Sequence, residues 1–211
     1  MNDSWIIFCP SGFWQIKGIK EARKLGNKIL SIDSNEKAEG FKYSDDYLCL
    51  DTNDYDNVIN QLKKKNINIV ASLSFCSDIG VELCAHIRIK FSIEGYSLET
   101  ASNVVNKFHQ RSQWEKAGLQ EDFNWKGFMD PLKAFKYLKN TDSKKVLKPV
   151  DSSGSKGVLI IKNKSELEIN DVKKAFEYSK SKQIIIEDFI DGKEYTVEVF
   201  YQKENALILA I

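Results

Sequence analysis

The chain has 211 residues, with 31 basic and 30 acidic side chains and a formal net charge of +1. That length suffices for one large domain or two small ones with a real core. Because nucleic-acid binding needs clustered positive charge, the balanced charge argues against a nucleic-acid partner. No apolar run reaches the roughly 20 residues needed to cross a bilayer, and the first residues lack the pattern of a signal peptide. We therefore expect a cytoplasmic protein without a membrane partner.

The cysteines and histidines suggest neither disulfides nor a metal site. The cysteines are scattered without a C-x-x-C pair, and the histidines His86 and His109 lack the spacing of metal ligands. We expect all the thiols to be reduced and to lie in the core of the protein. The four cysteines are Cys9, Cys49, Cys76 and Cys84.

Strands and helices are predicted to alternate through the first 92 residues. Short apolar runs predict strands, and apolar residues at helical spacing predict the helices between them. This alternation favours a parallel sheet. The strands are expected at 5–9, 28–33, 47–50 and 67–74. One helix is expected at 14–25, a second between the last two strands with its end near residue 65, and a third at 78–88.

The first strand, turn and helix have the order that opens a dinucleotide-binding fold, and the second strand ends in an acid, Asp33. The turn reads Pro10-Ser-Gly-Phe-Trp14 and lacks the first and third glycines of G-x-G-x-x-G. A Rossmann-type oxidoreductase is therefore a rival interpretation that the missing glycines count against. Asp33 is equally well explained as an acid that caps a turn or a helix.

The middle of the chain is predicted to be helical. Residues 97–117 carry apolar side chains along one stripe, which predicts a single helix that Gly118 ends. A strand at 123–129 and a helix at 130–139 follow, the helix starting with a proline in its first turn.

A further helix is predicted after the next pair of strands. Ser165 and Glu168 match a capping box, so we expect the helix to start there and to reach about residue 179, with a break near Asn170.

The segment 144–162 reads as strand, polar loop and strand. Because strand side chains alternate between faces, Lys148 shares a face with Val146 and Val150, and a buried ammonium needs a partner. The loop from Asp151 to Gly157 supplies two glycines and three hydroxyls, which let donors approach an anion closely. A cation followed by such a loop suits a phosphate, although a soluble surface hairpin explains the loop alone.

A second carboxylate lies on an apolar strand face further along. Glu187 shares its face with Ile185 and Phe189, and Asp191-Gly192 makes a turn. A strand is expected to follow, with Glu194, Thr196 and Glu198 on one face. The main chain beside Glu187 could pair with a purine ring, and Glu194 could hold ribose hydroxyls. An amphipathic strand with one wet face explains Thr196 and Glu198 equally well.

Together these runs resemble the ATP-grasp superfamily. The resemblance rests on Lys148-Pro, the serine-glycine loop and Ile-Glu187-Asp-Phe-Ile-Asp-Gly-Lys-Glu194-Tyr-Thr-Val-Glu, and it extends over the whole chain. That superfamily includes carboxylate–amine ligases, biotin carboxylase and the synthetase halves of carbamoyl-phosphate synthase. It implies ATP as the cofactor, bound by residues from four segments of the chain. Those residues are Lys107, Lys148, Ser152, Ser153, Gly154, Ser155, Gly157, Glu187, Asp188, Ile190 and Glu194.

The resemblance also implies a role for each part of that set. Lys148 would contact the α-phosphate, and the loop 152–157 would cover the β- and γ-phosphates together with Lys107. Glu187 would meet the adenine amino group, beside the carbonyl of Asp188 and the N–H of Ile190. Glu194 would bind ribose.

The fold implied is α/β: a Rossmann-like pre-ATP-grasp domain and then the α+β lid subdomain of an ATP-grasp fold, truncated in the second lobe. We expect the Rossmann-like domain at 1–92, a helical linker at 93–120, the lid at 121–183 and the start of the second lobe at 184–211. Ligands for Mg²⁺ are expected beyond residue 211, so we expect a fragment that does not catalyse ligation by itself.

The full-length protein would activate a small carboxylate as an acyl phosphate for attack by an amine. The substrates are not readable from the sequence, and a homodimer is left open. A nucleotide-binding or scaffolding module without catalysis is the other rival interpretation.

Overall fold

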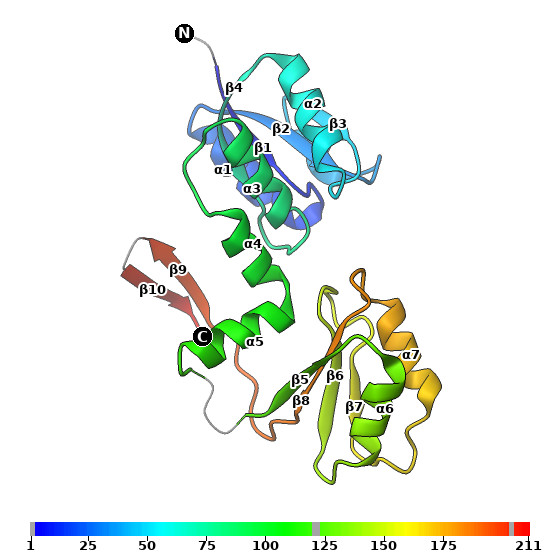
Figure 1. The fold of residues 1–211 in the computed structure, drawn as a ribbon. Coiled ribbons are helices and arrows are strands. Elements are labelled where there is room, and N and C mark those ends of the chain that lie inside the picture. The colour runs from blue at the N-terminus through cyan, green and yellow to red at the C-terminus, as the bar shows by residue number, and fades with distance from the viewer. Residues whose placement is uncertain (1–2, 120–122, 203–204) are drawn as a thin grey trace.

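The computed structural model describes residues 3–119, 123–202 and 205–211, which form three separate sheets (Figure 1). The chain is a mixed α/β protein. The N-terminal unit holds the first sheet, two helices connect it to a second sheet, and a hairpin stands apart near the C-terminus.

The N-terminal unit is built on a parallel sheet with strand order β3-β2-β1-β4, which confirms the prediction from alternating elements. Alternate residues of β1 and β2 serve two cores. Ile6, Phe8 and Ile29 pack towards α1, whereas Ile7 and Leu30 pack with the apolar side of α3. The elements are β1 (Ser4–Phe8), η1 (Phe13–Gln15), α1 (Ile16–Lys24), β2 (Lys28–Asp33), η2 (Glu39–Tyr43), β3 (Asp46–Cys49), α2 (Tyr55–Lys65), β4 (Asn68–Leu73) and α3 (Val81–Lys90).

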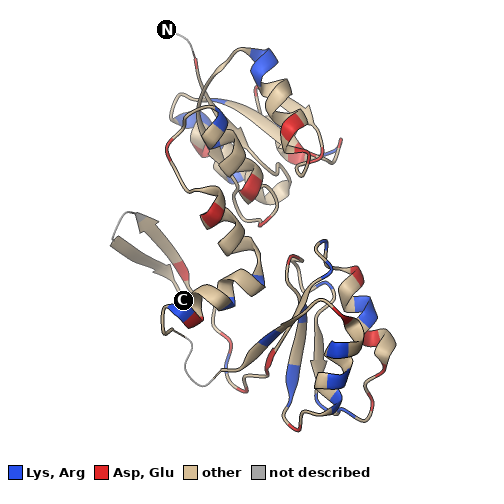
Figure 2. Cartoon of the chain, in the orientation of Figure 1, with Lys and Arg blue, Asp and Glu red and all other residues tan. Residues whose placement is uncertain are grey.

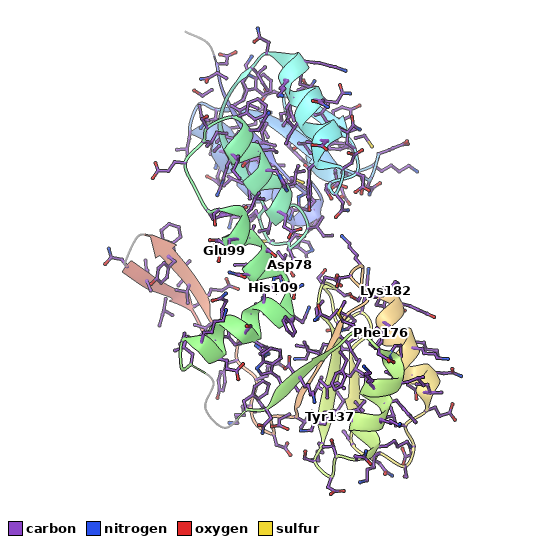
Figure 3. The ribbon with its side chains drawn as sticks, viewed as in Figure 1. Asp78, Glu99, His109, Tyr137, Phe176 and Lys182 are labelled. Atoms are coloured by element: carbon purple, nitrogen blue, oxygen red, sulfur yellow. The ribbon has the colours of Figure 1, made fainter. Side chains whose placement is uncertain are left out.

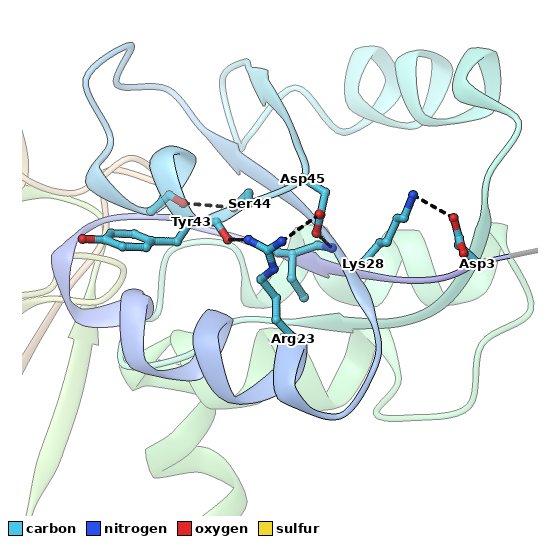
Figure 4. Close-up of polar contacts among 8 residues, drawn as sticks. Asp3, Arg23, Lys28, Tyr43, Ser44 and Asp45 are labelled. Atoms are coloured by element: carbon cyan, nitrogen blue, oxygen red, sulfur yellow. Dashed lines mark hydrogen bonds and ion pairs between the residues drawn. The ribbon is translucent and has the colours of Figure 1, made fainter.

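Polar contacts fasten the loops of this unit. Asp33 accepts a hydrogen bond from the backbone N–H of Ser11 at 2.8 Å, so the acid at the end of β2 secures the turn after β1. Near the start of β2, Asp45 accepts from Arg23 at 3.1 Å and from the N–H of Ile29 at 2.9 Å (Figure 4). Asp33 therefore acts as an acid that stabilises a turn, as the interpretation without a dinucleotide predicted.

The connection between the sheets consists of two helices, and the single helix expected at 97–117 is wrong. Helix α4 (Leu98–Val105) ends at Asn106, where the backbone becomes extended, and α5 (Lys107–Lys116) begins at once in a new direction (Figure 1). The Asn106 carboxamide oxygen caps α5 by accepting from the N–H groups of Phe108 and His109. Helix α4 packs on α3, whereas α5 contacts β8 of the second sheet.

The second sheet is antiparallel, with order β5-β8-β6-β7. Helices α6 and α7 cover one face around a core that includes Leu147, Ile184 and Ile186. The strands are β5 (Trp125–Phe128), β6 (Lys145–Pro149), β7 (Leu159–Ile161) and β8 (Ile184–Asp188), and the helices are α6 (Pro131–Lys139) and α7 (Ile169–Glu177).

Two sequence expectations for this unit change. Strand β8 lies between β5 and β6, so the sheet continues to Asp188 and does not end at the expected boundary after 183. Helix α7 has Glu168 as its N-cap, and Asp171 accepts from the Glu168 N–H at 3.0 Å. Ser165 instead bonds to Asn163 in the preceding turn, so the predicted capping box is wrong.

The last element is a two-stranded hairpin of β9 (Glu198–Gln202) and β10 (Asn205–Ala210). The strand expected from Glu194 begins only at Glu198, and Glu194 and Thr196 lie exposed before it. The side chains described along β10 are exposed as well.

The cysteines divide into two pairs. Cys9 and Cys84 are buried thiols, whereas Cys49 and Cys76 are exposed, so the expectation of four core thiols holds only for the first two. Burial is the main cause that raises the pKa of Cys84 to about 12. None of the described helices combines the length and the apolar character that a bilayer span requires.

Candidate functional site

The candidate site lies on the face of the antiparallel sheet opposite α6 and α7. In the register of β6 and β8, Val146 is paired with Glu187 and Lys148 with Ile185. Their neighbours Leu147 and Ile186 belong to the core on the other face, so alternation places Lys148 and Glu187 together on the face that α5 approaches. The sequence predicted that each of these two residues lies on an apolar strand face, and in the structure the two faces are one and the same.

Helix α5 is held on this face by aromatic packing. The Phe108 and Trp125 rings meet edge to face with centroids 5.2 Å apart. The absence of a side chain at Gly127 makes room for Phe108, because a Cβ there would lie 2.6 Å from two of its ring carbons. This packing brings α5 over the sheet, and Figure 2 shows that α5 carries basic segments.

Three charged residues meet in what we call the Glu187 cluster: Lys148, Arg111 and Glu187. Lys148 Nζ and Arg111 Nη2 each lie 3.0 Å from the same oxygen, Oε2 of Glu187. The Glu187 side chain is only 3% exposed, and its other oxygen, Oε1, has no hydrogen-bond partner within the described part of the chain. A buried carboxylate is costly unless it is paired, so the two cations stabilise it, and Oε1 is left as an unused acceptor.

Lys107 adds a further cation at the start of α5. Its Nζ donates to the carbonyl oxygen of Ser152 at 2.6 Å, and its backbone N–H donates to Val150 at 2.9 Å. Burial is the main cause that lowers the pKa of Lys107, the charge of Asp78 opposes this shift, and the charge of Lys148 adds to it. Lys107 is therefore close to the Glu187 cluster and to the beginning of the glycine loop.

The glycine loop, residues 151–157, is anchored at its first residue and exposed in its middle. Asp151 accepts from the N–H groups of Lys180 at 3.1 Å and Ser181 at 2.8 Å. Burial alone would raise the pKa of Asp151, but these and neighbouring serine hydrogen bonds outweigh burial and lower it. Gly154, Ser155 and Gly157 have positive φ, and residues 153–156 are exposed, so the loop can present backbone groups and hydroxyls to a ligand.

The remaining predicted site residues follow β8. The Asp188 carboxylate binds Lys145 and both the backbone and side-chain N–H groups of Asn124, so that side chain fastens β8 to its neighbours. Burial would raise the pKa of Asp188, but the pairing with Lys145 and Asn124 holds it below its usual value. Ile190 and Glu194 lie exposed in the irregular segment before β9, so the structure does not bring Glu194 into the Glu187 cluster.

A cleft of about 330 Å³ adjoins the start of the glycine loop and separates it from the N-terminal unit. Asp78, on the loop before α3, lies on the side of the N-terminal unit that faces this cleft (Figure 3). Lys180 Nζ donates across the gap to Asn53 Oδ1 at 2.8 Å. Polar residues of the N-terminal unit, of α4 and its end, and of the glycine loop line the cleft, among them Thr52, Tyr55, Glu82, Ser102, Asn106 and Ser153.

Arg111 was not predicted from the sequence. It lies one helical turn after Lys107, so the two share a face of α5, and that spacing could have pointed to it. Its guanidinium lies 4.5 Å from the centroid of the Trp114 ring and 5.3 Å from that of Phe123. A basic residue one helical turn after another is common on helices, so the spacing alone does not indicate a site. The ion pair with Glu187 is what marks Arg111 as a site residue.

The arrangement fits a nucleotide. Lys107, Lys148 and Arg111 together outnumber Glu187 in charge, which suits phosphate, and the buried Oε1 can accept from an amino group. For a metal the result differs: among the residues described, no group of three or more His, Cys, Asp or Glu side chains is placed to hold an ion.

Comparison with known proteins finds a family match that includes these residues. The model of the ATP-grasp domain family matches residues 142–211, which include Lys148, the glycine loop and Glu187. Over these residues the resemblance to the ATP-grasp superfamily is confirmed. The match begins just before β6 and covers β6, β7, α7, β8 and the hairpin.

Curated relatives and solved structures extend the likeness beyond the matched domain. Phosphoribosylamine–glycine ligase of Methanosphaera stadtmanae is 26% identical over 175 residues, which cover 75% of this chain and 37% of the relative. The same enzyme of Methanothermobacter thermautotrophicus is 26% identical over 116 residues, covering 53% of this chain and 27% of the relative. The chain thus spans well under half the length of both relatives.

The fold is also similar to that of solved ATP-grasp structures. L-amino acid ligase from Bacillus licheniformis has a TM-score of 0.77 and 20% identity, with coverage of 99% of this chain and 49% of that one. N5-carboxyaminoimidazole synthetase from Staphylococcus aureus, solved with ADP, has a TM-score of 0.69 and 12% identity, with coverage of 93% and 48%. At these identities the likeness establishes the fold.

Proposed function

We propose that this chain forms the ATP-binding part of a ligase that activates a small carboxylate as an acyl phosphate, which an amine then attacks. The observation that carries the proposal is the Glu187 cluster beside Lys107 and the glycine loop. ATP bound here would supply the phosphoryl group for the activation. The ATP-grasp domain match over residues 142–211 and the relatives, which are phosphoribosylamine–glycine ligases, support the same class of reaction.

The cations and the loop act on the phosphates in this proposal. Lys148 binds the α-phosphate, and Lys107 with the donors of residues 152–157 holds the phosphates beyond it. Lys107 is suited to this task because it is partly desolvated and donates to only a carbonyl oxygen in the structure, so an anion is a better partner for it. The exposed middle of the loop can cover the phosphates and exclude water, which would hydrolyse an acyl phosphate.

The residues of β8 and beyond recognise the rest of the nucleotide. Glu187 accepts from the adenine amino group through Oε1, which is buried and has no partner within the described residues. The carbonyl of Asp188 and the N–H of Ile190 pair with the ring edge, since the Asp188 side chain is already engaged and fixes the main chain there. Glu194, exposed before β9, binds ribose after the segment 189–197 adjusts.

The experiment that tests the proposal measures ATP binding by titration calorimetry for the wild-type chain and for Lys148→Met and Glu187→Gln. A charge-assisted hydrogen bond contributes about 1.5–3 kcal/mol, so Lys148→Met is expected to weaken ATP binding by about 10- to 100-fold. Glu187→Gln is expected to reduce the preference for ATP over GTP, because guanine presents a carbonyl where adenine presents an amino group.

Lys126→Met is the matched control. Lys126 belongs to the same sheet, is exposed, and is paired with Ile186, so it lies on the face opposite the Glu187 cluster. Its loss should leave ATP affinity unchanged. A wild-type chain that binds NADH and not ATP would favour the oxidoreductase interpretation, and binding of neither nucleotide would refute the proposed function.

A further inference from the structure

Two cations on different elements share one oxygen of Glu187. Lys148 reaches Oε2 from β6 and Arg111 reaches it from α5, both at 3.0 Å. One carboxylate needs only one cation for charge balance, so the cluster holds a surplus positive charge in a site where the carboxylate is almost fully buried. The second cation requires an explanation that stability alone does not give.

Lys148 and Arg111 differ in their freedom to leave. The Lys148 side chain is 27% exposed and sits on a flexible four-carbon stem, whereas the Arg111 side chain is 15% exposed and lies against the Trp114 ring. Arg111 is also fixed through α5, whose Phe108 packs on Trp125 and over Gly127. Lys148 is therefore the cation that can turn to a phosphate, and Arg111 is the one that stays.

Departure of Lys148 would be unfavourable without a second cation. An ion left unpaired in a buried position is strongly destabilising. If Lys148 were the sole cation beside Glu187, the carboxylate would therefore hold Lys148 in place. With Arg111 in place, Glu187 remains paired at Oε2 after Lys148 leaves, and Oε1 keeps its orientation towards a ligand amino group.

We infer, on the basis of the nucleotide site proposed above, that Arg111 is a positioning residue: it keeps Glu187 paired while Lys148 moves from Glu187 to a phosphate of the nucleotide. Arg111 touches no phosphate itself in this account. Its removal turns Lys148 into the sole counter-ion of Glu187, which reduces the affinity for phosphate without changing the adenine contacts.

The test compares ATP with adenosine, measured by calorimetry and by ligand-detected NMR at millimolar adenosine, in wild type and in Arg111→Met. Adenosine has no phosphate for Lys148 to bind, so its affinity does not depend on the release of Lys148 from Glu187. The ratio of ATP affinity to adenosine affinity is therefore expected to fall about tenfold in Arg111→Met. Adding Glu187→Gln releases Lys148, so the double variant is expected to recover most of that ratio. Arg88→Met is the control, since Arg88 donates to the Ser72 carbonyl and lies 4.0 Å from the Tyr96 ring centroid in the N-terminal unit.

A ligand-free measurement checks the pairing itself. Urea midpoints are compared for Lys148→Met, Arg111→Met and the variant with both changes. Each single change leaves Glu187 one cation, so the combined loss is expected to exceed the sum of the single losses, and adding Glu187→Gln is expected to restore most of it.

The outcomes separate the two proposals. A wild-type chain that binds neither ATP nor adenosine removes the proposed function, and the inference with it. ATP binding that weakens by the same factor as adenosine binding in Arg111→Met, or urea losses that simply add, overturns the role of Arg111 and leaves the nucleotide site intact.

Discussion

Gly127 is the position where a single methyl group should disturb the site without touching a charged residue. A Cβ at Gly127 would lie 2.6 Å from Cδ2 and Cε2 of Phe108, closer than real Cβ contacts allow. In Gly127→Ala the ring of Phe108 must therefore move, and α5 with it, since Phe108 is in the first turn of that helix. Lys107 and Arg111 would be displaced from the sheet face together.

The magnitude follows from two opposing effects. Overpacking a filled site costs about 1–3 kcal/mol, whereas replacing glycine by alanine within a strand returns about 0.5–1 kcal/mol of backbone entropy. Overpacking is the larger effect because two ring carbons, backed by the helix, oppose the new methyl group. We expect a net loss of about 1–2 kcal/mol, which at a typical slope of about 2 kcal/mol per molar urea lowers the midpoint by about 0.5–1 M.

The assay is urea unfolding followed by circular dichroism and tryptophan fluorescence. Gly192→Ala is the matched control, because a Cβ at Gly192 meets nothing within 4 Å and its φ is not positive. Phe108→Leu combined with Gly127→Ala should recover part of the loss, since the smaller side chain accommodates the methyl group. A Gly127→Ala midpoint equal to that of wild type would refute the packing of α5 on the sheet.

Three further predictions concern stability. Asn106→Ala removes the acceptor that caps α5 and should cost about 0.5–2 kcal/mol in urea unfolding, whereas Asn106→Asp keeps the cap and should cost little. Asp151→Ala should cost about 1 kcal/mol at pH 7 by removing the acceptor of two N–H groups. Because the pKa of Asp151 is lowered from 3.8, its contribution is present above that pH, and the difference from wild type should shrink as the pH falls below about 3.8. Burial raises the pKa of the Cys84 thiol from 9.0 to about 12, so the stability that the neutral thiol contributes is present below pH 9 and is lost as the pH rises, by about 1.4 kcal/mol at pH 10. Urea midpoints measured at pH 8 and pH 10 should show this loss, and Cys84→Ala should reduce the difference between the two midpoints.

The local elements were predictable because their signals are local. The alternating apolar runs of the first 92 residues are sufficient to indicate a parallel sheet, and the strand faces of Lys148 and Glu187 follow from the period of two. That the two faces coincide depends on β8 lying beside β6. This order is set by tertiary packing and by the register Val146 with Glu187, neither of which the sequence reveals by itself.

The errors have physical causes of the same kind. The apolar stripe from Leu98 to Phe108 runs through Asn106, so periodicity predicts one helix where the chain makes two. The break is stabilised by distant contacts, such as the Lys107 N–H with the Val150 carbonyl. At α7, Glu168 with Asp171 outcompetes the earlier match because Asn163 already engages Ser165. Arg111 was missed because a lone arginine on a helix has no pattern of its own.

The bend at Asn106 divides the chain into a part that packs with the N-terminal unit and a part that packs with the antiparallel sheet. Helix α4, before the bend, packs on α3, whereas α5, after it, packs on the antiparallel sheet through Phe108. A rotation at this joint would widen or narrow the gap above the glycine loop while the spacing among Lys107, Arg111, Lys148 and Glu187 stays constant. The four charged residues therefore share one side of the bend.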